Sequence, residues 1–208
     1  MLSQPISALS NRDLLAVLVG ESQADCMLLE TGGCLSDLFP SEPSTVLMAR
    51  EPGASYGWAQ PRLLLAASRE LSRRCISEEL VGAGQKLNSP SQVKDYLKLS
   101  LSTLPHEVFM VLWLDGQNCL IEVEELFRGT LTQTSVYPRE IVKGAVLRNA
   151  AAVILAHNHP SGMAEPSQAD RSLTELLRSA LAFVDCKVMD HIIVAGNDTV
   201  SFAERGWL

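Results

Sequence analysis

The chain has 208 residues, of which 47% are hydrophobic and 20% charged, enough apolar material for one large globular domain or two small ones. No apolar run reaches the roughly 18 residues that cross a bilayer, and the N-terminus lacks the basic and then apolar segments of a signal peptide. The formal net charge of −7 gives no support to general binding of nucleic-acid phosphates.

The cysteines indicate a reducing environment. There are five, an odd number, and no two of them form a Cys-x-x-Cys pair. A disulfide framework or a zinc site built from thiolates is therefore not expected. We expect a cytoplasmic protein whose free thiols are Cys26, Cys34, Cys75, Cys119 and Cys186.

The first part of the chain has the pattern of short helices. A polar segment at residues 10–13 resembles a helix cap, and Gly20 is a typical helix stop. The first predicted helix runs from this cap through Val19, and the next two cover residues 25–30 and 61–75. Gly, Asn, Ser and Pro then cluster over residues 82–90, as is typical of a linker. We therefore predict a helical region over residues 1–82 and a second domain over residues 88–208.

Helical and extended patterns alternate after this linker. The predicted helices cover residues 89–101, 138–149 and 166–181. The predicted strands cover residues 108–114, 118–126, 130–136, 151–156, 184–189 and 191–195. Strands and helices in this order predict a mixed α/β domain. The fold class expected for the chain is therefore α/β, with a small N-terminal helical region before the mixed α/β domain.

The most informative segment runs from His157 to Asp170 and reads HNHPSGMAEPSQAD. It follows the apolar run 151–156, which is expected to be a buried strand. His157 and His159 are two apart, so in an extended chain both rings point to one side. Ser167 and Asp170 are three apart, so at a helix start they share one face. The pattern thus offers three zinc ligands and one hydroxyl, and three protein ligands are typical of catalytic zinc.

The same residues allow a second interpretation without a metal. Ser-x-x-Asp before an apolar helix is also the pattern of a capping box, with Ser167 as the N-cap and Asp170 near the third helical position. A His-x-His pair also occurs on surface turns. The joint pattern beside a buried strand and a turn favours the metal site over a capped helix with two solvated histidines.

The motif resembles that of the JAMM (MPN+) zinc metalloproteases, and the sequence around it resembles their RadC branch. The stretches that carry the likeness, in order, are residues 107–115 (EVFMVLWLD), 127–130 (FRGT), 138–140 (PRE), 149–152 (NAAA), 157–162 (HNHPSG) and 190–193 (DHII). The resemblance implies a JAMM/MPN-type domain over residues 88–208 with one zinc ion bound by His157, His159 and Asp170. It also implies hydrolysis of an amide or isopeptide bond, with a glutamate as general base and Ser167 stabilising the oxyanion.

Glu107 is the predicted general base. It precedes the apolar run 108–114, an expected central strand, and stands where the family's first strand begins with Glu-Val. A carboxylate entering such a strand is costly to bury without a partner, and a zinc-bound water would be a suitable one. The alternatives are a solvated Glu107, or Glu140 at a helix start, where an acidic residue suits the dipole. His106 falls outside the motif. A charged cluster is expected to be solvated, namely Glu122, Glu124 and Glu125.

Two roles fit the dipeptide Asp190-His191, which also matches the family. One is a contact to a ligand histidine. The other, which we favour at this stage, is a buried hydrogen-bonded pair that ties down a strand.

The N-terminal region resembles the helix-hairpin-helix region of RadC proteins at residues 9–16 and 66–74. Such hairpins bind DNA phosphates through a Gly-hydrophobic-Gly turn whose backbone amides face the strand. The corresponding residues 53–58 keep two glycines at the wrong spacing, so the hairpin is expected to be degenerate. A small basic patch is conceivable on one helix, although a solvated helix face is favoured, at Arg62, Arg69, Arg73 and Arg74.

Three functions follow from these patterns. The first, which the chemistry of the site favours, is a zinc-dependent hydrolase acting on a peptide or protein substrate. The second is a DNA-repair-associated or DNA-binding accessory protein with an idle or structural metal site. The third is a zinc-dependent nuclease that uses the same site. No membrane association is expected, and exposed edge strands would allow a homodimer.

Overall fold

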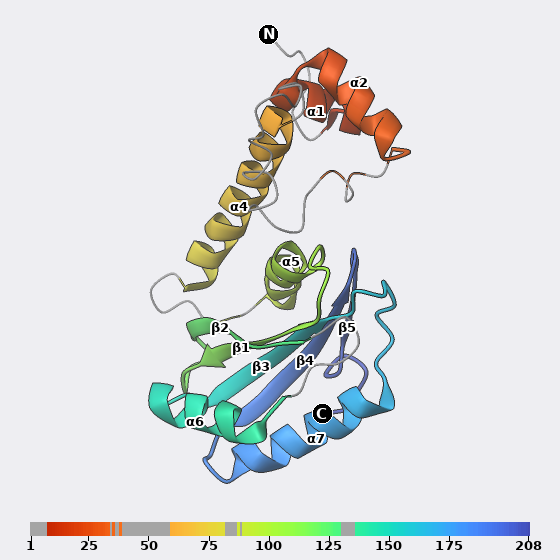
Figure 1. Cartoon of the computed structure of the whole chain (residues 1–208). Coiled ribbons are helices and arrows are strands. Elements are labelled where there is room, and N and C mark those ends of the chain that lie inside the picture. Colours follow the sequence, from red (N-terminus) through yellow and green to blue (C-terminus); the bar gives the residue numbers. More distant parts are fainter. Residues whose placement is uncertain are drawn as a thin grey trace, which may run out of the picture. The chain divides into compact units, whose positions relative to one another are not determined.

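The computed structural model describes residues 8–33, 35, 38, 59–81, 87, 89–129 and 136–208 (Figure 1). The chain divides into two compact units, Met1–Ser72 and Arg73–Leu208. No helix among the described residues is long and apolar enough to span a membrane. All residues expected to form the metal site lie in the second unit.

The described part of the first unit is helical. It contains α1 (Asn11–Val19), α2 (Glu21–Glu30) and the first part of α4 (Ala59–Val81). Gly20 joins α1 to α2 with a φ of +89°, a conformation that a residue with a Cβ rarely adopts. Leu15, Met27 and Leu65 belong to the apolar cluster of this unit. The predicted hairpin turn at residues 53–58 lies outside the described residues.

Two helices are longer than predicted. α2 begins at Glu21 rather than at residue 25, because Gly20 both ends α1 and precedes the next helix. α4 extends from Ala59 to Val81 rather than over residues 61–75. Its last turns are stabilised because Ile76 and Leu80, four residues apart on one helix face, pack into a hydrophobic cluster of the second unit.

A five-stranded sheet forms the centre of the second unit, in the order β2-β1-β3-β4-β5. Its strands are β1 (Val108–Leu114), β2 (Leu120–Arg128), β3 (Ala152–Asn158), β4 (Lys187–Ala195) and β5 (Asp198–Ser201). β1 pairs antiparallel with both β2 and β3, whereas β3 and β4 run parallel. Every residue of β1 and of β3 is buried, as expected from their apolar sequences.

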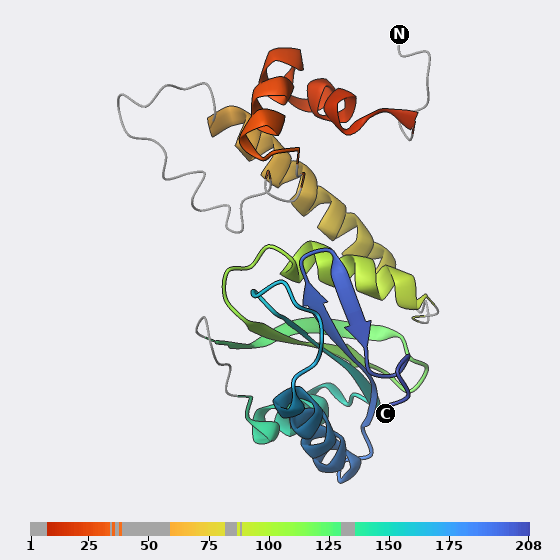
Figure 2. The ribbon, with the colours of Figure 1, turned by 90° about the vertical axis from the view of Figure 1, so that its right-hand side faces the viewer.

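Helices cover both faces of this sheet (Figures 1 and 2). α5 (Pro90–Leu101) packs on one face, and α6 (Pro138–Arg148) and α7 (Gln168–Ala182) lie on the other. Each face has its own hydrophobic cluster, because successive side chains of a strand point to opposite sides. Leu112 lies in the cluster with α5, and Trp113 in the cluster with α6. The predicted α/β class with a mixed sheet is confirmed.

The strands near the C-terminus differ from the prediction. Segments 184–189 and 191–195 were predicted as two strands, but one continuous strand, β4, covers the second half of the first segment and all of the second. β4 has a bulge at Met189, because Val153 pairs with Val188 and Ile154 with Asp190. The strand therefore continues through Met189. β5 was not predicted, because its four residues carry little apolar signal. Most of the predicted strand at 130–136 lies outside the described residues.

β2 begins two residues later than predicted, at Leu120. The Asp115 carboxylate accepts hydrogen bonds from the backbone N–H groups of Gln117 and Cys119, both at 2.8 Å. These bonds hold the pKa of Asp115 below its ordinary value. Because Asn118 also adopts a left-handed conformation with a φ of +62°, the turn extends through Cys119 before pairing begins.

Gly144 allows α6 to lie close to Trp113. A Cβ at this position would stand 2.6 Å from Cζ2 of Trp113, which is fully buried in β1. We expect Gly144→Ala to lower the free energy of unfolding by about 1–2 kcal/mol, because overpacking costs more than the gain in helix propensity. Denaturant unfolding measures this effect. Gly116→Ala is the control, since nothing lies within 4 Å of a Cβ added there, and equal midpoints for Gly144→Ala and wild type would contradict the expectation.

Candidate metal centre

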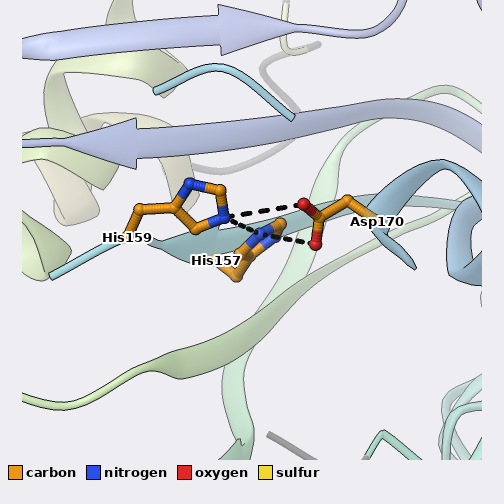
Figure 3. A group of neighbouring side chains, drawn as sticks. All are labelled: His157, His159 and Asp170. Atoms are coloured by element: carbon orange, nitrogen blue, oxygen red, sulfur yellow. Dashed lines mark hydrogen bonds and ion pairs between the residues drawn. The ribbon is translucent and has the colours of Figure 1, made fainter. Parts of the chain in front are cut away.

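The C-terminal end of β3 carries two histidine side chains toward one point (Figure 3). His157 is 1% exposed, and its imidazole stacks on the ring of Phe109, its partner in the β1–β3 register. His159 follows the strand, and its Nδ1 donates a hydrogen bond to the carbonyl of Met163 (2.8 Å). The Nε2 atoms of the two histidines therefore face each other at 3.0 Å.

The start of α7 supplies the third side chain. Ser167 is the N-cap, and its Oγ accepts from the N–H of Asp170 while the Asp170 carboxylate accepts from the N–H of Ser167 (2.7 Å). This capping box holds Asp170 with its Oδ1 3.2 Å from Nε2 of His157 and its Oδ2 3.6 Å from Nε2 of His159. The two interpretations left open by the sequence, a capping box and a metal site, are thus compatible.

The three side chains form a donor set that suits zinc. One nitrogen or oxygen atom from each of His157, His159 and Asp170 lies within 4.8 Å of the others. Two imidazole nitrogens and one carboxylate oxygen are common ligands of a catalytic zinc ion that keeps a further position open. The structure thus brings together the three residues that the motif predicts as ligands. Their binding of a metal stays a prediction.

The electrostatics of the centre favour a cation. Burial opposes ionisation of Asp170, but hydrogen bonds with His157 and His159 outweigh it and hold the pKa of Asp170 well below its ordinary value. The hydrogen bond with Asp170 also raises the pKa of His159, although burial acts in the opposite direction. The carboxylate is therefore charged at neutral pH, and a proton on His159 competes with any metal ion.

Zinc affinity is consequently expected to rise with pH. Because the pKa of His159 is raised, its proton must be released for Nε2 to bind a metal at pH values below that pKa. Affinity should rise by about tenfold per pH unit in that range and level off above it, as expected for the release of one proton. Competition with a chromophoric chelator at several pH values, corrected for the chelator's own protonation, measures this. An affinity that does not change with pH would contradict the expectation.

Glu107 lies beside the centre. It precedes β1 directly and is half-buried. The register pairs Phe109 with His157, and continuing it by two residues places Glu107 opposite His159. After the larger effect of Asp170, the charge of Glu107 also raises the pKa of His159. Glu107 is not one of the three grouped side chains, and this position suits a base better than a ligand.

Asn158 fastens the segment that carries Glu107. Its Oδ1 accepts from the N–H of Val108 (2.8 Å), and its Nδ2 donates to the carbonyls of His106 (3.0 Å) and Leu104 (3.4 Å). The side chain is only 2% exposed, so these bonds are shielded from water. Because they lie on both sides of Glu107, Asn158 fixes the backbone of Glu107 relative to β3. The sequence motif gave no indication of this role.

Loss of the Asn158 amide is expected to destabilise the fold. We expect Asn158→Ala to lower the free energy of unfolding by about 2–3 kcal/mol, because a buried N–H and two carbonyls lose their partner. Denaturant unfolding of the metal-free protein measures this loss without any contribution from a ligand. Asn197→Ala, at an exposed turn, is the matched control. Equal losses of unfolding free energy in the two variants would contradict a stabilising role for the Asn158 hydrogen bonds.

The other glutamates have partners of their own. Glu140, the rival base, lies in the first turn of α6, 3.3 Å from Arg139 and 3.9 Å from Lys143. Glu124 is only partly solvated, with a side chain that is 31% exposed and a carboxylate that accepts a hydrogen bond from Nε1 of Trp113 (3.1 Å). A buried indole N–H needs an acceptor, which explains why this carboxylate packs against β1.

His191 and Thr174 lie behind the centre. His191 of β4 is fully buried, with its Nε2 2.8 Å from Nδ1 of His157 and its Nδ1 2.6 Å from Oγ1 of Thr174. Burial holds the pKa of His191 well below its ordinary value. His191 therefore has the contact to a candidate ligand histidine that we considered but did not favour. Asp190 ties β4 to the C-terminal segment by accepting from Oγ of Ser201 (2.6 Å).

Thr174 was missed by the sequence analysis. Its only signal is its position four residues after Asp170, on the same face of a predicted helix. Such a threonine is more often a helix residue that bonds back to a carbonyl, and Thr174 does this as well, with Oγ1 2.6 Å from the carbonyl of Asp170.

A cavity of about 570 Å³ opens beside His159. Cavities of this size are typical of sites for small ligands or short peptide segments. Its described lining consists of Ser102, Thr103, Leu104, Pro105, His159, Pro160, Ser161, Gly162 and Gly196. Of the three candidate ligands, His159 is the one that lines this cavity.

A mixed sheet with helices on both faces, and a His-His-Asp group where β3 meets α7, define a domain of the JAB/MPN type. The family model described as "RadC-like JAB domain" matches residues 87–207, and the chain belongs to this family. It is 51% identical to a UPF0758 protein of Dechloromonas aromatica over 217 residues, which cover 100% of this chain and 93% of the relative. A UPF0758 protein of Thiobacillus denitrificans is also 51% identical, over 218 residues and the same shares. These names state no activity.

Proposed function

We propose that this protein is a zinc-dependent hydrolase that cleaves an amide or isopeptide bond in a peptide or protein. The observation that supports it is the convergence of the ligand atoms of His157, His159 and Asp170 within 4.8 Å of one another. The half-buried carboxylate of Glu107 beside this group supports a catalytic rather than a structural site, because structural zinc is usually enclosed by four protein ligands.

The side chains have distinct tasks in this proposal. His157, His159 and Asp170 hold the ion, which when bound supplies Lewis-acid activation of water and of the scissile carbonyl. Glu107 takes a proton from the attacking water and passes it to the leaving amine. Ser167 donates to the developing oxyanion, an interaction typically worth about 3 kcal/mol. In the structure its hydroxyl donates to Oδ2 of Asp170 (2.6 Å), so it must turn toward the substrate to do this.

A cleavage screen tests the proposal. Zinc-loaded full-length protein is incubated with linear peptides and with peptides joined through a lysine side-chain amide, and the products are identified by mass spectrometry. We expect cleavage of at least one class by the wild type and none by Asp170→Asn, which weakens the ligand set while keeping the side chain's shape. A wild type that holds zinc stoichiometrically and cleaves neither class would overturn the proposal and favour a structural metal.

A DNA-associated role is the alternative. It depends on the arginines of α4 and on residues 53–58, which lie outside the described part of the chain. Arg62 lies 3.6 Å from Glu30, so one positive charge of the possible patch is already balanced. The alternative predicts DNA affinity that falls steeply with salt and drops on replacing these arginines. Plasmid nicking that disappears in Asp170→Asn would instead favour the nuclease.

A further inference from the structure

We infer that Thr174 and His191 hold the imidazole proton of His157 on Nδ1 and thereby keep Nε2 of His157 free to bind a metal ion. They act as positioning residues behind the centre, in a chain of hydrogen bonds from α7 through β4 to β3. The inference rests on the proposed zinc site for its purpose. The placement of the proton, however, follows from the hydrogen bonds of the protein alone.

The chain of bonds starts at a group that can only accept. The carbonyl of Asp170 lies 2.6 Å from Oγ1 of Thr174, so the single hydroxyl proton of Thr174 points to this carbonyl. Toward His191 the same hydroxyl oxygen can then only accept. Nδ1 of His191, at 2.6 Å, must therefore carry a proton and donate a hydrogen bond to Oγ1 of Thr174.

The second step fixes the other nitrogen of His191. Its Nε2 lies 2.8 Å from Nδ1 of His157. If this Nε2 also carried a proton, His191 would be a cation with no exposed surface, and an uncompensated buried charge is costly. The favoured arrangement leaves Nε2 of His191 bare, so that it accepts a hydrogen bond from the N–H of Nδ1 of His157.

The third step concerns the candidate ligand itself. Because Nδ1 of His157 is engaged with His191, Nε2 is the nitrogen that remains for a metal ion. This atom faces the centre, 3.0 Å from Nε2 of His159 and 3.2 Å from Oδ1 of Asp170. The hydrogen-bond chain thus holds a proton on Nδ1 of His157, so that any proton shared between Nε2 and Asp170 is the one that a metal ion displaces.

Packing keeps the chain of bonds in place. Thr174 is 2% exposed, and His157 and His191 are buried as well. The ring of Phe109 stacks on His157, and the ring of Phe202 lies against His191 with 4.9 Å between centroids. Asp170 contributes twice, because its carboxylate belongs to the candidate ligand group and its carbonyl anchors Thr174. The same helical turn therefore places one ligand and orients another.

Nuclear magnetic resonance of the full-length, metal-free protein tests the placement directly. Long-range ¹⁵N–¹H correlations distinguish the two tautomers of each imidazole. We expect a proton on Nδ1 of both His157 and His191, and a bare Nε2 on His191. A proton on Nε2 of His157 with a bare Nδ1 would overturn the inference, even if the protein binds zinc.

Zinc affinity of two Thr174 variants tests the purpose of the chain. Thr174→Val keeps the shape but removes the hydroxyl, whereas Thr174→Ser keeps the hydroxyl. We expect a loss of roughly 10- to 100-fold in zinc affinity for Thr174→Val, as for other groups that orient ligand histidines, and near wild-type affinity for Thr174→Ser. Equal affinities for the two folded variants would overturn this role, and if Thr174→Val does not fold, the imidazole spectrum of the wild type still decides.

The two proposals fail in different ways. A wild type with the expected tautomers that binds no zinc would defeat the proposed hydrolase but not the proton placement. A wild type that binds zinc and cleaves peptides, with His157 in the other tautomer, would defeat the placement alone.

Discussion

Replacing His157 with alanine is expected to abolish stoichiometric zinc binding. Nε2 of His157 lies within 3.2 Å of a ligand atom of each of the other two residues, so its loss opens the centre of the group. The ring is buried and stacked on Phe109, so another side chain cannot easily take its place. After zinc loading and desalting, plasma mass spectrometry should find about one zinc per wild-type chain and a small fraction of that in the variant.

A matched control exists within the same part of the chain. His106 is the only histidine outside the contacts of the centre, and His106→Ala should keep wild-type zinc content. His159→Ala is a second ligand variant that is less prone to misfold, because the His159 side chain is 18% exposed and less embedded in the core than His157. Loss of zinc in both variants would therefore point to the ligands and not to a misfolded protein. If the wild-type protein held no zinc at neutral pH, the assignment of a metal centre would be contradicted. The capping box would then be the remaining role of Ser167 and Asp170.

Local geometry explains why the candidate ligands could be predicted from the sequence. His157 and His159 are two positions apart in extended chain, and Ser167 and Asp170 are three positions apart at the start of a helix. Backbone periodicity alone sets these relations. The segment between the two pairs is short and turns at Gly162, which has a φ of +79°, so the histidines and the start of the helix must lie close together. A motif within 14 residues therefore predicts the group well.

The contacts behind the centre depend on non-local pairing. Thr174 and His191 meet because β3, α7 and β4 form a parallel crossover, and the register of β4 includes a bulge beside Val153 and Ile154. Apolar strands buried on both faces do not reveal their register in the sequence, because no alternation marks one face. The sequence could suggest that His191 matters, but not which atom it contacts.

The position of Glu107 has the same origin. An entirely apolar β1 indicates a central strand, but its antiparallel pairing with β3 decides which end lies beside the histidines. The role of Asn158 was even less predictable from the sequence. It stands between two predicted ligands at a position the motif leaves open, and its three hydrogen bonds to residues 104, 106 and 108 appear only when β1 and β3 are paired.

Glu107→Gln is expected to keep zinc and lose turnover. The amide has nearly the same size as the carboxylate but cannot accept a proton at neutral pH. General-base catalysis contributes roughly 10²- to 10⁴-fold, so the rate on the best substrate of the cleavage screen should fall by this factor. Zinc content should remain at the wild-type level, because Glu107 is not one of the grouped ligand residues. Turnover and metal content measured on the same preparations separate the two effects.

Glu140→Gln is the control that separates the two candidate bases. Glu140 lies beside Arg139 and Lys143 at the start of α6, so neutralising it should remove surface ion pairs worth little and leave the rate unchanged. If Glu140→Gln were inactive and Glu107→Gln active, Glu140 would be the general base, and the assignment of the metal ligands would be unaffected. If both lost zinc, Glu107 would act on the fold or the ligands rather than on a proton. Only loss of turnover with retained metal in Glu107→Gln alone identifies a general base, because ligand loss and misfolding both remove zinc.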